Sequence, residues 1–375
     1  MRATRAIVRL DHLRWNLDQI RAHTASRAPL LCLAVKADAY GHGITQIGLA
    51  AERFGVDYLA VATADEGVEL REAGSRLPIL LYSLATPEEM PTIVAHEIIP
   101  ILSDTGQIEQ YAAESARQGR QTTVHIKVDT GMGRIGCRPE DAVEVASRVA
   151  EADALSLGGI STHFAAADSA DPAYTQEQHA RFAQALAAIR DAGVDPGIVH
   201  AANSGGVLAH PDTWYDMVRP GIIAYGYYPS GEQDRALELR PVMELRSKVV
   251  YIKTVEAGEA ISYGMTWRAP RRTTIGTIPA GYGDGYNRLL SNRAEVWIGG
   301  RRYPLTGRVC MDQLMVDLGP QSTVSRYDEA VLFGYEQNAP TAEELAGLCS
   351  TITYEITCAI SRRVPRIYVA GDEER

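Results

Sequence analysis

The sequence predicts an α/β fold, a (β/α)8 TIM-type barrel followed by a mainly β C-terminal domain. From about residue 30 to residue 220, short apolar runs alternate with helical patterns, and the runs number about eight, which is the number that a barrel needs. After about residue 228, β-type runs separated by turn residues follow one another almost without helices. The chain has 375 residues and 46% hydrophobic content, enough for a barrel-sized domain and a smaller one.

Each element has a local signal. Residues 5–10 alternate like a strand, and Asp11 is expected to cap the helix that follows. Helices are expected from Thr63, from Ser103, near Pro139 and from Thr175, with Gly74, Gly119 and Gly193 placed just after three of them. The eight barrel strands are the runs LLCLAV (30–35), YLAVA (from Tyr58), ILLY (Ile79), IIPIL (Ile98), TVHIKV (Thr123), LGGISTHF (Leu157), IVHAAN (Ile198) and YDMV (Tyr215).

The domains follow from the change in pattern. We expect a β/α barrel over residues 11–230, a linker at about 229–241 and a mainly β domain over 241–375, which the N-terminal strand (1–10) could join. One helix from Thr341 interrupts this second domain.

Composition narrows the function. Lys and Arg number 37 against 47 Asp and Glu, a net charge of −10, which argues against nonspecific binding to nucleic acid or anionic membranes. The five cysteines form no CxxC pair, and neither a secretory signal nor an apolar run of membrane-spanning length is visible. We therefore expect a cytoplasmic protein with a small-molecule substrate, and we assign no metal site.

Lys36 is the first candidate for chemistry. The apolar run 30–35 delivers it to the carboxyl end of a buried parallel strand, where barrel enzymes place their reactive groups. The alternative is a lysine that only ends the strand and points to solvent. Polar residues at other strand ends favour the first interpretation, because five strand ends share one predicted rim: Tyr40, Arg134, His163, Asn203, Ser204 and Arg219.

The same rim suits one cofactor. Asn203, Ser204, Gly205 and Gly221 could form a phosphate cradle from backbone N–H groups and hydroxyls, although two tight turns would also explain them. A Schiff-base lysine, a phosphate cradle and an arginine that can face a pyridine ring are together what pyridoxal phosphate (PLP) requires.

A competing motif is weak. GMGRIG (131–136) matches the dinucleotide pattern GxGxxG, but Pro139 indicates that the next helix begins after the third glycine. The sequence contains no HExxH, GxSxG or GxxxxGK[ST], which disfavours zincins, α/β-hydrolases and P-loop proteins.

The whole set of motifs resembles the alanine racemases, PLP enzymes with an N-terminal barrel and a C-terminal β domain. The matching stretches run in order along nearly the whole chain: AVKADAYGHG, KVDTGMGRIG, STHFA, NSGG, VRPGI, SYGMTW, GYGDGY, GRVCMDQ and YEITCAISRRVPR. The resemblance implies racemisation of alanine, supplying D-alanine for cell-wall synthesis, in a homodimer whose subunits share their active sites.

The resemblance also implies roles for single residues. Lys36 would hold PLP and act as one base, and Tyr263 would act on the opposite face from the partner subunit. Arg134 and the Met311 backbone would bind the substrate, and Lys127 matches a lysine that can be carbamylated in this family. The PLP contacts would be Lys36, Tyr40, Arg134, His163, Asn203, Ser204, Arg219, Gly221, Ile222 and Tyr354. Residues at the entrance to the site or behind these contacts would be Lys127, Asp168, Tyr282, Arg288, Arg308 and Asp312.

Two bases on opposite faces of the α-carbon account for racemisation. Lysine and tyrosine have ordinary pKa values of about 10.4 and about 10, so the site must lower both, and neighbouring arginines offer one route. Three alternatives stay open: a racemase of other amino acids, a PLP decarboxylase on the same architecture, which would pair the ring nitrogen with a carboxylate rather than Arg219, and a PLP-carrier barrel, which would lack the second domain.

Overall fold

Eight parallel strands form the barrel in the computed structural model, which describes residues 2–27, 29–233 and 235–371. Their hydrogen-bonded order is β8-β7-β6-β5-β4-β3-β2-β9. Asp216 joins the two ends of this order, because its N–H donates to the Val199 carbonyl (3.1 Å) and its carboxylate accepts from the Val199 N–H (2.8 Å). The predicted barrel is therefore confirmed, with strands β2 (Leu30–Ala34), β3 (Tyr58–Val61), β4 (Ile79–Leu81), β5 (Ile98–Leu102), β6 (Thr122–Lys127), β7 (Leu155–Ser161), β8 (Ile198–His200) and β9 (Met217–Val218).

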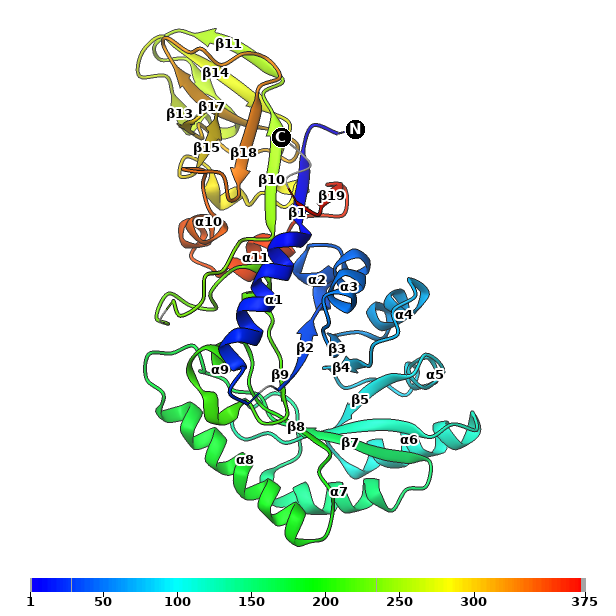
Figure 1. The fold of residues 1–375 in the computed structure, drawn as a ribbon. Coiled ribbons are helices and arrows are strands. Elements are labelled where there is room, and N and C mark those ends of the chain that lie inside the picture. Colours follow the sequence, from blue (N-terminus) through cyan, green and yellow to red (C-terminus); the bar gives the residue numbers. More distant parts are fainter. Residues whose placement is uncertain (1, 28, 234, 372–375) are drawn as a thin grey trace.

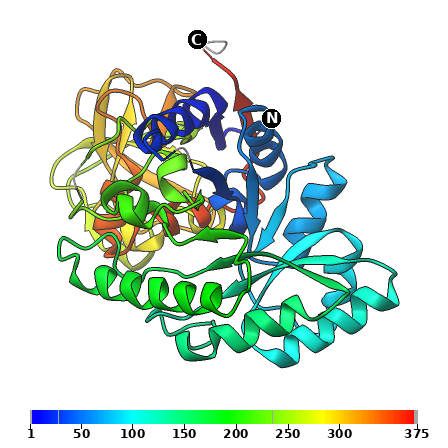
Figure 2. The ribbon, with the colours of Figure 1, turned by 60° about the horizontal axis from the view of Figure 1, so that its bottom comes forward.

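Helices surround the barrel (Figures 1 and 2). Gly74, Gly119 and Gly193 follow three of them with φ of 96°, 64° and 79°, the left-handed conformation expected where a helix stops. No helix opens inside GMGRIG, since a 3-10 turn (Pro139–Asp141) precedes α7. The helices are α1 (Leu10–Thr24), α3 (Ile44–Arg53), α4 (Ala64–Glu72), α5 (Met90–Ala95), α6 (Thr105–Arg117), α7 (Ala142–Ala150), α8 (Ala173–Asp191) and α9 (Ser204–Ala209).

One predicted cap is wrong. Helix α1 already begins at Leu10, so Asp11 lies in its first turn and caps nothing. Its carboxylate instead accepts hydrogen bonds from the Arg9 guanidinium, at 2.8 Å from Nε. A bidentate arginine pair outcompetes the weaker cap to backbone N–H groups.

The second part of the molecule is built from two main sheets. The larger has the order β16-β15-β18-β10-β1-β19, and the smaller has the order β11-β14-β17. The strands are β10 (Met243–Lys248), β11 (Tyr251–Val255), β12 (Ala260–Ile261), β13 (Trp267–Arg268), β14 (Thr273–Ile278), β15 (Glu295–Ile298), β16 (Arg301–Pro304), β17 (Leu314–Gly319), β18 (Glu329–Phe333) and β19 (Arg366–Val369).

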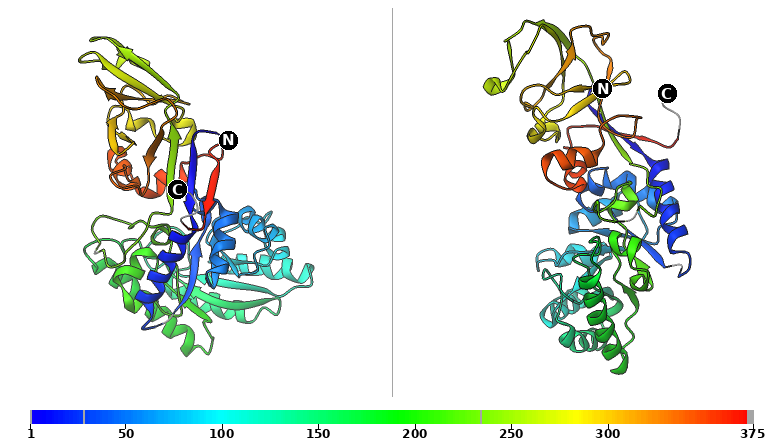
Figure 3. Two further views of the ribbon diagram at one scale, coloured as in Figure 1. Left: turned by 45° about the horizontal axis from the view of Figure 1, so that its top comes forward. Right: turned by 90° about the vertical axis from the view of Figure 1, so that its left-hand side faces the viewer.

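The N-terminal strand β1 (Arg5–Arg9) lies inside the larger sheet, antiparallel to β10 and parallel to β19 (Figure 3). Because α1 follows β1 directly, the chain passes straight from this sheet into the barrel. The expected linker and the expected end of the second domain include residues 234 and 372–375, which lie outside the described residues.

Within the described residues, two α-helices accompany these sheets, where one was expected. The expected helix is α10 (Ala342–Cys349), which begins with a capping box between Thr341 and Glu344. Helix α11 (Thr353–Cys358) was not predicted, because three of its six residues have β-branched side chains that disfavour a helix locally. Among the described residues, no helix is both long and apolar enough to cross a membrane.

Candidate active site

A cavity of about 530 Å³ lies at the carboxyl ends of the barrel strands. Ligand pockets commonly have volumes of about 300–1,000 Å³. All the residues to which the resemblance assigns a cofactor contact line this cavity, together with Lys127 and Asp168: Lys36, Tyr40, Arg134, His163, Asn203, Ser204, Arg219, Gly221, Ile222 and Tyr354.

Lys36 opens a turn of unusual backbone conformation, labelled α2 (Lys36–Tyr40). The four residues after it, 37–40, have φ between 53° and 55°, the left-handed region. This conformation costs about 1–2 kcal/mol for each residue with a Cβ atom. Such a turn persists only where its surroundings hold it, and strained backbone of this kind is concentrated at functional sites.

Contacts from two sides hold the turn. The Glu66 carboxylate of α4 accepts a hydrogen bond from the Ala37 N–H at 2.6 Å. From the larger sheet of the second domain, Arg366 of β19 donates to the Gly41 carbonyl, at 3.1 Å from Nε and 2.9 Å from Nη2. Tyr368 on the same strand donates to the His42 carbonyl at 3.1 Å. The conformation at Lys36 therefore depends on both parts of the chain.

The Lys36 amine lies in a site that favours its neutral form. Burial lowers its pKa below the usual value, and the positive charge of Arg134 lowers the pKa further. Burial is the larger cause, whereas the sequence suggested neighbouring arginines. A neutral amine is the form that can act as a nucleophile or a base.

Arg219 is a buried cation, with 5% of its surface exposed. Its guanidinium donates to the carbonyls of Thr162 (2.7 Å) and Ala201 (2.9 Å) and to His200 Nδ1 (2.9 Å). Within the residues that the structure describes, no carboxylate pairs with it. Its charge therefore remains available to a ligand in the cavity.

Two histidines behind Arg219 were not predicted as site residues. Because arginine can only donate, His200 Nδ1 must accept, and its Nε2–H donates to His125 Nδ1 at 2.8 Å. Burial lowers the pKa of His125 to about 3 and that of His200 well below its usual value, so both rings are neutral. Their positions in TVHIKV and IVHAAN, within apolar strands, were the available signal.

The proposed phosphate cradle has tight geometry. The Ser204 hydroxyl accepts from the Gly221 N–H at 2.9 Å, and the Asn203 side chain accepts from the Gly206 N–H at 3.0 Å. A Cβ atom on Gly221 would lie 2.6 Å from the Tyr40 hydroxyl. Only glycine leaves Tyr40 its place against the cradle.

Two arginines in the lining, Arg134 and Arg219, make the charge of the cavity mostly positive. Lys127 is buried, and burial, followed by the charges of Arg219 and Arg134, holds its pKa well below the usual value. Burial and then Lys127 do the same to the pKa of His163. Asp168 is the one carboxylate in the lining that the described residues supply. Such a lining suits an anionic ligand.

Several predicted site residues lie elsewhere in this chain. Tyr263, Tyr282, Arg288, Arg308, Met311 and Asp312 all belong to the second part and do not line the cavity. Tyr263 is 72% exposed and Met311 is 53% exposed. A single chain thus brings together the expected PLP contacts but not the second base.

Comparisons with known proteins identify the family to which both parts of the chain belong. The family "Alanine racemase, N-terminal domain" matches residues 8–229, and "Alanine racemase, C-terminal domain" matches residues 242–368. The chain belongs to the alanine racemase family. It is an enzyme of the isomerase class.

Individual relatives of the alanine racemase family match over their full length. The alanine racemase of Treponema denticola is 44% identical over 98% of this chain and 99% of its own, and that of Symbiobacterium thermophilum is 43% identical over 98% and 97%. Among solved structures, alanine racemase of Clostridium difficile 630 has a TM-score of 0.94 at 37% identity, covering 100% of this chain and 97% of that one. Alanine racemase from Bartonella henselae with covalently bound pyridoxal phosphate has a TM-score of 0.87 at 26% identity, covering 98% and 100%.

The alanine racemase family depends on PLP, and the residues of this cavity fit that cofactor. A lysine with a lowered pKa can bind an aldehyde, Ser204 and Gly221 can face a phosphate, and the buried Arg219 lacks a carboxylate partner among the described residues. Tyr82, which the sequence analysis did not select, also lines the cavity. It follows directly after β4, so its place at a strand end was the missed signal.

Proposed function

We propose that the chain interconverts L-alanine and D-alanine with PLP bound through Lys36, as a cytoplasmic homodimer that supplies D-alanine for cell-wall synthesis. The observation that carries this proposal is Lys36 itself, a half-buried lysine with a lowered pKa on a strained turn inside a positively charged cavity. When bound, PLP absorbs the electron pair left on the substrate α-carbon after the α-proton is removed.

The chain's own residues supply the rest. The Lys36 amine exchanges the α-proton on one face, and Tyr263 of the partner subunit exchanges it on the other. The substrate carboxylate is bound by Arg134 of the same chain and by the N–H of Met311 of the partner subunit. Carbamylation of Lys127, which needs its neutral amine, would place a negative charge beside Arg134 and Arg219.

Arg219 distinguishes racemisation from decarboxylation in this proposal. A guanidinium does not readily give up its proton, so Arg219 would donate a hydrogen bond to the pyridine nitrogen of PLP and would leave that nitrogen unprotonated. The cofactor would then be a weaker electron sink, which would favour return of the α-proton over side reactions. His200 and His125 support this role, because both are neutral and leave Arg219 as the cation at this position.

The test is the variant Lys36→Ala combined with a substrate panel. We expect the wild-type protein to be yellow and to racemise alanine, whereas Lys36→Ala loses both the visible absorbance and turnover. Racemisation of a panel of L-amino acids separates an alanine racemase from a broad-specificity enzyme. Retained racemisation by Lys36→Ala would refute the assignment.

A further inference from the structure

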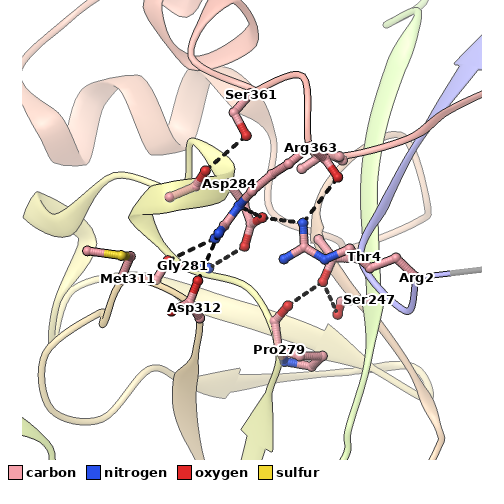
Figure 4. A network of polar contacts seen from close by, with 12 residues as sticks. Arg2, Thr4, Ser247, Pro279, Gly281, Asp284, Met311, Asp312, Ser361 and Arg363 are labelled. Carbon is pink, nitrogen blue, oxygen red and sulfur yellow. Dashed lines mark hydrogen bonds and ion pairs between the residues drawn. The ribbon is translucent and has the colours of Figure 1, made fainter.

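A buried carboxylate outside the cavity joins three distant segments of the second domain (Figure 4). Asp284 has no exposed side-chain surface. Its carboxylate lies 2.5 Å from Arg2 Nη1, accepts from Arg363 Nε at 2.7 Å and accepts from the Gly281 N–H at 3.0 Å. These partners hold the Asp284 side chain in one position, because breaking any one of the contacts would leave a buried negative charge less well compensated.

The same network also contacts the loop that carries Met311. Arg363 also pairs with Asp312 (2.9 Å) and donates to the Met311 carbonyl (3.2 Å). The loop after Gly281 adds two backbone contacts, since the Tyr282 N–H donates to the Cys310 carbonyl (3.0 Å) and the Gly283 N–H to the Met311 carbonyl (2.9 Å). The Met311 carbonyl is thus held from two sides.

The Met311 N–H is left free by these contacts. In the described part of the chain, this N–H donates no hydrogen bond, although the carbonyls of Cys310 and Met311 on either side of it both accept one. The Met311 N–H shares its planar peptide unit with the Cys310 carbonyl, so holding that carbonyl fixes the direction of the N–H bond. Holding the Met311 carbonyl fixes the next peptide unit and so keeps the Met311 residue in place. The donor is therefore oriented and available.

The glycines of GYGDGY permit this contact. A Cβ atom on Gly281 would lie 2.2 Å from the Cys310 carbonyl oxygen, and one on Gly283 would lie 2.6 Å from Arg363 Nη2. Side chains at either position would push the two loops apart. The motif thus makes room for the Arg363 guanidinium and the Met311 backbone.

We propose that Asp284 and Arg363 are positioning residues that orient the Met311 N–H toward the substrate carboxylate in the partner's cavity. This inference rests on the proposed function, in which Met311 completes the site of the other subunit. Asp284 fixes Arg363, Arg363 fixes the Met311 carbonyl, and Arg2 extends the network to the N-terminal arm. Neither Asp284 nor Arg363 touches the substrate.

The test compares Arg363→Gln with Arg302→Gln. Arg302 is a matched control, because it also donates to a carboxylate (Glu344, 3.1 Å) and to a backbone carbonyl (Ala339, 2.8 Å) in the same domain but does not contact the Met311 loop. Propionate, which has a carboxylate but no amine, serves as the binding probe. The readouts are KM and kcat in both directions, the inhibition constant of propionate, and amide hydrogen exchange over residues 305–314.

Arg363→Gln is expected to raise KM for both enantiomers and the propionate inhibition constant about tenfold, the effect of one misplaced charge-assisted hydrogen bond. Hydrogen exchange of the loop should accelerate, while kcat changes less than about threefold and the visible spectrum of the bound cofactor is unchanged. Arg302→Gln should leave all of these readouts at wild-type values. Arg363→Lys, which keeps the charge near Asp284, should fall between Arg363→Gln and wild type and serves if Arg363→Gln does not fold.

Unchanged KM and propionate binding in Arg363→Gln, or equal changes in Arg302→Gln, would overturn the inference. A fall in kcat as large as the rise in KM would also overturn it, because a positioning role in carboxylate binding predicts separate effects. The wild-type assay keeps the two proposals apart. A wild-type protein that does not racemise alanine refutes the proposed function, whereas an active wild type with an unaffected Arg363→Gln refutes only the role of Asp284 and Arg363.

Discussion

His42 shows how a single residue couples the Lys36 turn to pH. Its Nδ1 lies 3.0 Å from the carbonyl oxygens of both Ala39 and Tyr40, so it must carry the proton and donate. The other nitrogen, Nε2, is buried and has no partner among the described residues. Burial lowers the pKa of His42 to about 4, since a charged ring would be desolvated there.

This pKa predicts an acid-sensitive turn. The unfolded chain protonates His42 below its usual pKa of 6.5, whereas the folded protein does so only near pH 4, so stability is present above pH 6.5 and is lost as the pH falls toward 4. The loss attributable to His42 is about 3 kcal/mol. The variant His42→Asn keeps a donor near the Nδ1 position but does not titrate.

We therefore expect the free energy of unfolding of His42→Asn, from urea titrations at pH 7 and pH 4, to depend less on pH than that of the wild type. Other buried histidines, including His125, contribute with the same sign, so the comparison between the two proteins is the decisive quantity. Parallel pH profiles would show that His42 is not responsible.

At the scale of elements, Glu66 in the first turn of α4 makes two kinds of contact. Glu66 closes a capping box with Thr63, and its carboxylate also accepts from the Ala37 N–H beside Lys36. Helix α10 has the same capping box, between Thr341 and Glu344, but neither residue lines the cavity. The chain thus offers two equivalent caps, of which only one touches the Lys36 turn.

Glu66→Gln and Glu344→Gln should each lower the free energy of unfolding by less than about 1 kcal/mol, because glutamine keeps the capping-box acceptor and only the negative charge at the helix N-terminus is lost. Only Glu66→Gln should change the reactivity of Lys36, because the Glu66 charge raises the pKa of that amine. The rate at which the apo protein captures PLP rises as Lys36 loses its proton. We expect its inflection at lower pH in Glu66→Gln than in wild type, measured by stopped-flow absorbance, and no shift in Glu344→Gln.

At the scale of the whole molecule, the cavity and the second base lie in different parts of one chain. Tyr263, Met265, Leu289 and Met311 expose large hydrophobic side chains on the second domain. The proposed homodimer with shared active sites would account for both facts, because each chain would give its Tyr263 to the other.

Mixed dimers test this arrangement directly. A dimer of one Lys36→Ala chain and one Tyr263→Ala chain should retain about half of the wild-type rate, because one of its two cavities has both residues intact. A dimer of wild type with the double variant Lys36→Ala/Tyr263→Ala should be inactive. Sites contained within single chains would give the reverse result in both dimers, measured as alanine racemisation after purification through two different tags.

The barrel and several helix ends could be predicted because their signals are local. Apolar runs mark β2 and the strands that follow it, Gly74 and Gly119 mark helix ends, and Lys36 stands where a buried strand stops. Two features could not be predicted. Asp11 does not cap α1, because its carboxylate pairs with Arg9 instead. Helix α11 forms although its local preference is against a helix, because tertiary packing overrides that preference.

By itself, therefore, the sequence determined most of the elements and most of the residues at their ends, since periodicity and turn chemistry are properties of neighbouring residues. Only the tertiary structure decided which distant residues meet: Arg366 with Gly41, His200 with His125, and Asp284 with Arg2 and Arg363. These contacts depend on barrel closure at Asp216 and on the place of β1 between β10 and β19. No local pattern contains that information, because the partners are brought together by the packing of whole sheets.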